Sequence, residues 1–161
     1  MTSPQVQTFI ARWHEIFERD DPELIIPLFS DDVEFFSPAI FAPKHGKTQV
    51  FELLRTVFEI FEGYRVIDTW TKGNEVMFEF EARVGKYTLQ GIDRFVLDDD
   101  GRVTQMKVWI RPLTGLKELA RSVMQAEADR RLTGRSASFK LLYRVQMRAT
   151  TILKAVADGL K

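Results

Sequence analysis

The chain contains no cysteine and only two histidines, His14 and His45. Without cysteine there is no disulfide, thiol nucleophile, thiolate zinc site or iron–sulfur cluster. The two imidazoles are far apart in the sequence, and the motifs HExxH, GxGxxG and GxxxxGKS/T do not occur. We therefore expect no metal ion, nucleotide or other cofactor.

Long apolar runs are also missing. The longest, residues 24–29, contains Pro27, and residues 1–12 lack the basic start and apolar run of a signal peptide. We therefore expect no membrane span and a cytoplasmic location. The 161 residues, of which 45% are hydrophobic, have the composition of one globular domain that buries a sizeable core.

The charges are distributed unevenly along the chain. Residues 1–110 carry 12 basic and 19 acidic side chains, whereas residues 111–161 carry 11 basic and 4 acidic ones. This pattern predicts an acidic domain over residues 1–112 and a basic helical extension over residues 113–161. The zero net charge and the lack of a base-stacking motif argue against nucleic acid as a partner.

In the first part of the chain, capping residues and the helical spacing of apolar residues predict two helices. A helix begins at Pro4 after the cap Ser3, with Trp13 at the centre of its apolar face. A second, short helix runs from residue 21 to about residue 29, and Pro27 should bend or shorten it.

A strand over residues 33–37 and a loop then lead to a third helix over residues 47–61. From residue 64 to residue 110 the apolar period changes to two, which predicts an antiparallel meander. Its strands cover residues 64–71, 76–84, 87–97 and 104–111, although the first has no clean apolar face. Helices followed by a meander are an α+β pattern.

The extension reads as two helices, over residues 113–132 and 137–160. The second has a continuous apolar stripe with basic side chains mainly beside it. Because the preceding domain is acidic, we expect the extension to pack on that domain or on a dimer mate.

Asp93 is the one charged residue on the inward face of the predicted strand 87–97. A carboxylate there must find donors or keep its proton, because an ionised, unpaired carboxylate is costly to bury. It is therefore a site candidate, the alternative being a structural aspartate bound by the Trp13 indole or by a backbone N–H. A register slip of one residue would instead bury Lys86 and Arg94, which is unfavourable.

Several short segments, taken in order, resemble one known superfamily. They are IARW at residues 10–13, LFSDDV at 28–33, SP at 37–38, HGK at 45–47, GID at 91–93 and LDDDGRV at 97–103. Over residues 5–112 the chain resembles the nuclear transport factor 2-like superfamily, in its SnoaL-like and ketosteroid isomerase-like branch. The resemblance implies a cone, in which three N-terminal helices pack on a curved antiparallel sheet around a pocket, usually in a homodimer.

The resemblance also implies roles for individual residues. Asp93 falls on the acid of the steroid isomerase oxyanion hole, Trp13 on its tyrosine, and Ser37 on its base. A serine hydroxyl does not take a proton from carbon at its ordinary pKa, which argues against ketosteroid isomerase activity. His45 is a further candidate base, or simply a histidine in a loop that enters a helix.

In such a cone the apolar interior serves both as core and as ligand wall. The expected pocket residues are Phe17, Phe35, Phe58, Phe78, Phe80, Phe95, Met106, Val108 and Ile110. We expect a protein that binds a flat, apolar small molecule in this pocket. Its function would be that of a cofactor-independent lyase, isomerase or cyclase for an apolar carbonyl compound, or of a non-catalytic ligand-binding or homodimeric interaction module.

Overall fold

The structure is a computed structural model that describes residues 3–132. Its elements are α1 (Pro4–Glu18), the 3-10 helix η1 (Pro22–Leu28), β1 (Phe29–Phe36), β2 (Lys44–His45), α2 (Lys47–Ile60), β3 (Glu62–Lys72), β4 (Glu75–Val84), β5 (Tyr87–Leu97), β6 (Val103–Arg111) and α3 (Leu113–Leu132). The fold is α+β, with three N-terminal helices and a helix after the sheet, as the sequence predicts.

The six strands form one sheet in the order β2-β1-β6-β5-β4-β3. Strands β3 to β6 form the predicted antiparallel meander. Strand β1, however, pairs with β6 in parallel and with β2 in antiparallel orientation, so the sheet is mixed rather than wholly antiparallel. The reason is topological: α2 carries the chain from one edge of the sheet to the other, and the meander then returns to β1.

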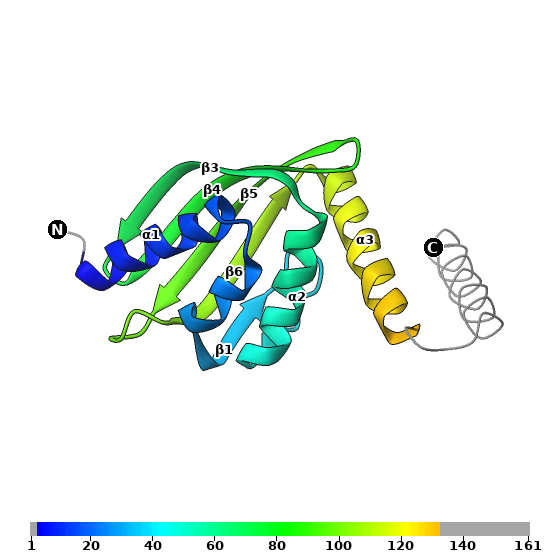
Figure 1. Cartoon of the computed structure of the whole chain (residues 1–161). Coiled ribbons are helices and arrows are strands. Elements are labelled where there is room, and N and C mark those ends of the chain that lie inside the picture. The colour runs from blue at the N-terminus through cyan, green and yellow to red at the C-terminus, as the bar shows by residue number, and fades with distance from the viewer. Residues whose placement is uncertain (1–2, 133–161) are drawn as a thin grey trace. The chain divides into compact units, whose positions relative to one another are not determined.

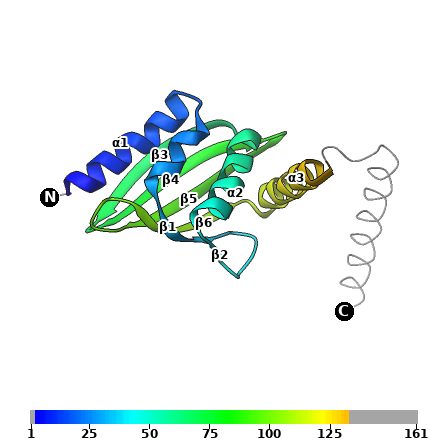
Figure 2. The ribbon, with the colours of Figure 1, turned by 60° about the horizontal axis from the view of Figure 1, so that its bottom comes forward.

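Helices α1 and α2 lie on the same face of the sheet, α1 across the strands of the meander and α2 closer to β1 (Figure 1). The second view agrees, with both helices on one side of the strands (Figure 2). Helix α1 begins as predicted, because the Ser3 side chain accepts a hydrogen bond from the Val6 N–H and Pro4 occupies the first turn.

The segment between α1 and α2 differs from its prediction. The short helix is a 3-10 helix that ends at Leu28, and Pro27 lies inside it. Proline lacks the N–H that an α-helix needs, so this segment does not extend to residue 29 as a regular α-helix. The strand begins at Phe29 rather than at residue 33, and its register with β6 shifts between Phe29 and Glu34.

The core lies between the helices and the sheet and is rich in phenylalanine. The nine residues expected to line a pocket all belong to it: Phe35, Phe78, Phe80, Phe95, Met106 and Val108 are buried, and Phe17, Phe58 and Ile110 are partly buried. Their side chains pack with the apolar face of α1, where Trp13 is buried.

The chain divides into two compact units, Met1–Met124 and Gln125–Lys161. The first unit includes the beginning of α3, where Leu119 packs with Val84 and Leu89. The predicted helix over residues 137–160 lies outside the described residues, and its packing partner stays a prediction. No helix within residues 3–132 is long and apolar enough to cross a membrane.

Candidate functional site

Asp93 points into the core from the middle of the sheet. Its strand neighbours in β4 and β6 are Phe78 and Val108, and its relative exposure is 5%. Ile92, which precedes it, is 36% exposed on the other face. The register predicted from the sequence is therefore confirmed, and the slipped alternative is not observed.

Two hydrogen bonds link Asp93 to α1 through Tyr64. The Tyr64 hydroxyl donates to Oδ2 of Asp93 at 3.4 Å, and Nε1 of Trp13 donates to the Tyr64 oxygen at 3.3 Å. Trp13 thus reaches Asp93 only indirectly, because Tyr64 lies between them. Both distances exceed the usual range for such bonds, so both bonds are weak.

Tyr64 comes from the predicted strand that lacks a clean apolar face. The residues of β3 that lean toward the core are Tyr64, Val66 and Thr69, and the pairing with β4 shifts between Val66 and Asp68. This irregularity changes which parity of residues faces inward. The alternation that would have identified Tyr64 is therefore interrupted within the strand.

Aromatic rings surround the hydrogen-bonded groups. Tyr64 stacks on Phe17 with 3.9 Å between ring centroids and an interplanar angle of 14°, and it lies 5.3 Å from Phe80. Trp13 packs against Phe95 and Phe78, at 4.7 and 6.1 Å between centroids. The cluster Trp13, Tyr64 and Asp93 is therefore a small polar group within an aromatic environment.

This environment changes the protonation of both acids. Burial raises the pKa of the Asp93 carboxyl from 3.8 to about 7, although the hydrogen bond from Tyr64 opposes the rise. Burial also raises the pKa of the Tyr64 phenol well above 10.0, and the charge of Asp93 raises it further. At neutral pH the phenol keeps its proton, while Asp93 exchanges between its neutral and ionised forms.

Among residues 3–132, neither of the two candidate bases forms a hydrogen bond or ion pair with this cluster. Ser37 follows β1, and its hydroxyl oxygen accepts a hydrogen bond from the Ala39 N–H at 3.1 Å. Nδ1 of His45 lies 3.4 Å from Oε1 of Glu34, and 63% of the His45 side chain is exposed. Since Phe35 next to Glu34 is buried, Glu34 and His45 belong to the opposite face of the sheet from Asp93.

His14 is less exposed than its place beside Trp13 in the sequence indicates. Its ring lies 5.8 Å from Phe78, and its Nε2 is buried without a hydrogen-bond partner among the described residues. His14 is partly buried because this side of α1 lies close to β4. Within residues 3–132, no three His, Asp or Glu side chains gather as a possible metal site.

Residues 10–106 match the family described as the SnoaL-like domain. Among solved structures, the chain is similar to a steroid delta-isomerase from Pseudomonas aeruginosa, with a TM-score of 0.77 and 32% identity over 80% of this chain and 95% of that one. None of the curated proteins compared with the sequence matches it.

Two further structures support the fold. A bacterial protein with a cystatin-like fold from Silicibacter pomeroyi DSS-3 has a TM-score of 0.70 and 26% identity, covering 84% of this chain and 92% of its own. An NTF2-like protein of unknown function from Mesorhizobium loti has a TM-score of 0.61 and 13% identity, covering 70% of this chain and 99% of its own. At 13% identity the likeness concerns the fold alone.

Proposed function

Because the chain belongs to the SnoaL-like domain family, we propose that its interior binds an apolar small molecule through one carbonyl or phenolic oxygen. The observation that carries this proposal is the hydrogen-bonded chain Trp13, Tyr64 and Asp93 inside an aromatic cluster. The rings would contact the flat body of the ligand, and the polar groups would bind its oxygen.

The protonation of the two acids fits this role. Below pH 7 Asp93 is mostly neutral and can donate a hydrogen bond, and the Tyr64 phenol is a donor throughout the neutral range. Two donors at one oxygen stabilise the negative charge that develops there when a neighbouring C–H loses its proton. Isomerases, lyases and cyclases that act on carbonyl compounds share this step.

Proton transfer also needs a base, and within the described residues neither Ser37 nor His45 forms a hydrogen bond with the cluster. The proposal therefore covers binding and polarisation of the carbonyl, and it does not include ketosteroid isomerase activity. Binding of the same ligand class without catalysis needs only these donors and no base.

The test is a carbon-detected NMR titration of the Asp93 carboxyl with and without 2-naphthol, a flat apolar compound with one oxygen. Naphthalene, which lacks that oxygen, is the matched control. We expect a pKa near 7 that moves with 2-naphthol and not with naphthalene, and a weaker response in Tyr64→Phe. A pKa at or below the ordinary value that no compound changes would overturn the proposal.

A second proposal concerns the sheet face opposite the helices, which exposes large apolar side chains. Trp109 is 49% exposed and pairs with Ile92, while Trp70 is 41% exposed and pairs with Met77. Charges of both signs flank them, such as the ion pair Arg94 and Glu75. We propose that two copies of the chain associate through this face, since a mixed-charge surface is complementary to itself across a two-fold axis.

A further inference from the structure

A cavity of about 320 Å³ lies outside the aromatic cluster, between the first half of α1, the end of η1 and the turn that joins β5 and β6. Neither Trp13, Tyr64 nor Asp93 lines it. Its volume is at the lower end of the range for small-molecule pockets. It is therefore a possible binding site of its own.

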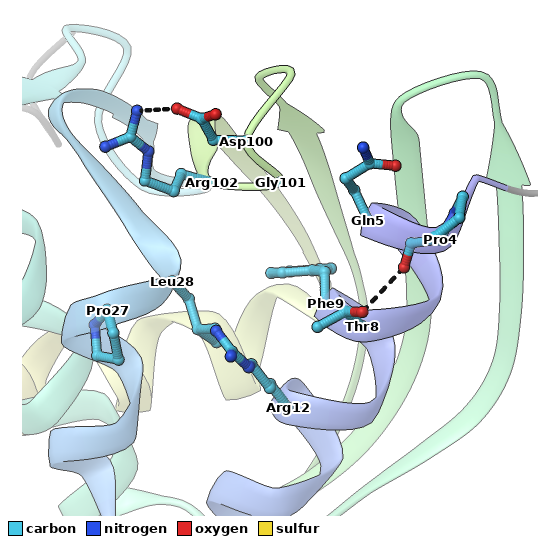
Figure 3. Close-up of a pocket in the computed structure, with 10 residues that line it drawn as sticks. All are labelled: Pro4, Gln5, Thr8, Phe9, Arg12, Pro27, Leu28, Asp100, Gly101 and Arg102. Carbon is cyan, nitrogen blue, oxygen red and sulfur yellow. Dashed lines mark hydrogen bonds and ion pairs between the residues drawn. The ribbon is translucent and has the colours of Figure 1, made fainter.

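The cavity is amphipathic. Figure 3 shows Arg12 extending from α1 toward the space between Phe9 and Leu28, with Arg102 and Asp100 at the opposite end. Phe9 and Leu28 belong to the buried core, so they present firm apolar walls. The cavity thus combines the Arg12 guanidinium group at one end with the apolar surface of Phe9 and Leu28.

Arg12 differs from most arginines of the described chain. Seven of them form ion pairs with carboxylates: Arg19, Arg55, Arg65, Arg83, Arg94, Arg102 and Arg121. Arg12 has no such pair within residues 3–132, because Glu15, the nearest acid on its helix, binds Arg19 at 2.6 Å. Its guanidinium group is consequently available to an anion in the cavity.

The second guanidinium group is already neutralised. Arg102 contacts Asp98 at 3.2 Å and Asp100 at 2.7 Å. Asp100 also lines the cavity and repels a second negative charge at that end. The charge pattern favours a ligand with one anionic group, placed near Arg12.

The turn that lines the cavity is held by hydrogen bonds within it and lies next to α1. Oδ1 of Asp98 accepts hydrogen bonds from the backbone N–H groups of Asp100 and Arg102. Gly101 has a φ of +78°, and a Cβ added to it would lie 3.1 Å from Cβ of Gln5. The wall is therefore formed before any ligand binds.

We propose that this cavity binds a monocarboxylate with an apolar body, whose carboxylate pairs with Arg12 while its body contacts Phe9 and Leu28. This inference does not depend on the proposed role of Asp93, because the two sets of polar residues are separate. The apolar wall Phe9 is shared, since its ring lies 6.0 Å from that of Trp13.

The test uses 3-phenylpropionate as the probe and follows the backbone amides of Gln5, Thr8 and Gly101 by NMR. Two matched compounds accompany it: the neutral 3-phenylpropanamide and the dicarboxylate benzylmalonate. We expect 3-phenylpropionate to shift these amides and to bind up to about fivefold more tightly than the amide. Benzylmalonate should bind no more tightly than 3-phenylpropionate.

Arg12→Gln should weaken 3-phenylpropionate binding by about fivefold, the effect of an exposed ion pair. Arg83→Gln removes the same charge from β4, from a group that pairs with Glu62 and does not line the cavity, so the affinity should stay within about twofold of the wild type. Asp93→Asn should also leave it unchanged, which separates this site from the proposed interior one. Equal losses in Arg12→Gln and Arg83→Gln, or shifts confined to the surroundings of Tyr64, would overturn the inference.

Discussion

The Asp93 carboxyl lies in the core and can ionise. Its contribution to the free energy of unfolding therefore depends on pH. The folded protein binds a proton at Asp93 with a pKa of about 7, whereas an unfolded chain has the ordinary value of 3.8. Between these values the folded state holds more protons than the unfolded state. The contribution of Asp93 to the free energy of unfolding therefore falls as pH rises from about 4 to about 7.

We predict that the wild type loses stability relative to Asp93→Asn over this pH range, by up to a few kcal/mol. Asparagine carries no charge at any of these pH values, so it avoids the cost of burying a carboxylate. The measurement is urea unfolding of both proteins at pH 5 and pH 8. Asp99→Asn, an exposed change in the β5–β6 turn, is the control and should follow the wild type; parallel profiles of the wild type and Asp93→Asn would contradict the prediction.

Gly91 is a second single residue on which the stability of the fold depends. A Cβ at this position would lie 2.5 Å from Cζ of Phe80 and 2.5 Å from the Trp109 carbonyl oxygen. We predict that Gly91→Ala lowers the free energy of unfolding by about 1–3 kcal/mol, because the ring and β6 must both move.

Urea denaturation measures the change, and Phe80→Leu provides a double-mutant cycle. The cost of Gly91→Ala should be smaller in the Phe80→Leu background, since a shorter side chain removes one of the two contacts. An equal cost in both backgrounds would assign the whole effect to the backbone of β6.

At the scale of elements, the β5–β6 turn depends on Asp98. Its carboxylate accepts hydrogen bonds from two backbone N–H groups and also contacts the Arg102 guanidinium group. We predict that Asp98→Ala lowers the free energy of unfolding by about 1–2 kcal/mol. Asp99→Ala removes the same charge from the next residue, for which the described chain contains no such bond, and should change stability by less than about 0.5 kcal/mol. Thermal unfolding of the two variants distinguishes these outcomes.

The elements were predictable wherever one apolar period continued without interruption. The strands β4 and β5 alternate regularly, so both their bounds and the inward position of Asp93 followed from the sequence. In β3 the shift near Ile67 breaks the alternation, which is why the sequence pattern did not require Tyr64 to face the interior. The parallel pairing of β1 with β6 was also missed, because it joins distant segments through backbone hydrogen bonds, which leave no local pattern in the sequence.

The candidate site was predictable in part for the same reason. A single inward charge identified Asp93, and the family resemblance pointed to Trp13. The sequence pattern did not identify Arg12 as a site residue, since an exposed arginine on a helix is common in globular proteins. Its interest arises only from the cavity that η1 and the distant β5–β6 turn complete.

For the whole molecule, the sheet face opposite the helices is the feature that bears on assembly. If two copies associate there, a positive charge at the centre of the exposed apolar surface should separate them. We predict that Trp109→Lys shifts the mass measured by sedimentation velocity from dimer to monomer. Lys117→Glu, a charge change on α3, is the control; a wild type that sediments as a monomer would contradict the proposed association.

The position of β6 between β1 and β5 also has a consequence for synthesis of the chain. A ribosome delivers β1 early, yet within the sheet β1 has only the two-residue strand β2 as a neighbour until residues 103–111 have emerged. Strands β3 to β5 can pair as they appear, whereas β1 must wait for the last strand. We expect a nascent chain that stops before β6 to expose the unpaired backbone edge of β1, and thus to be a target for chaperones.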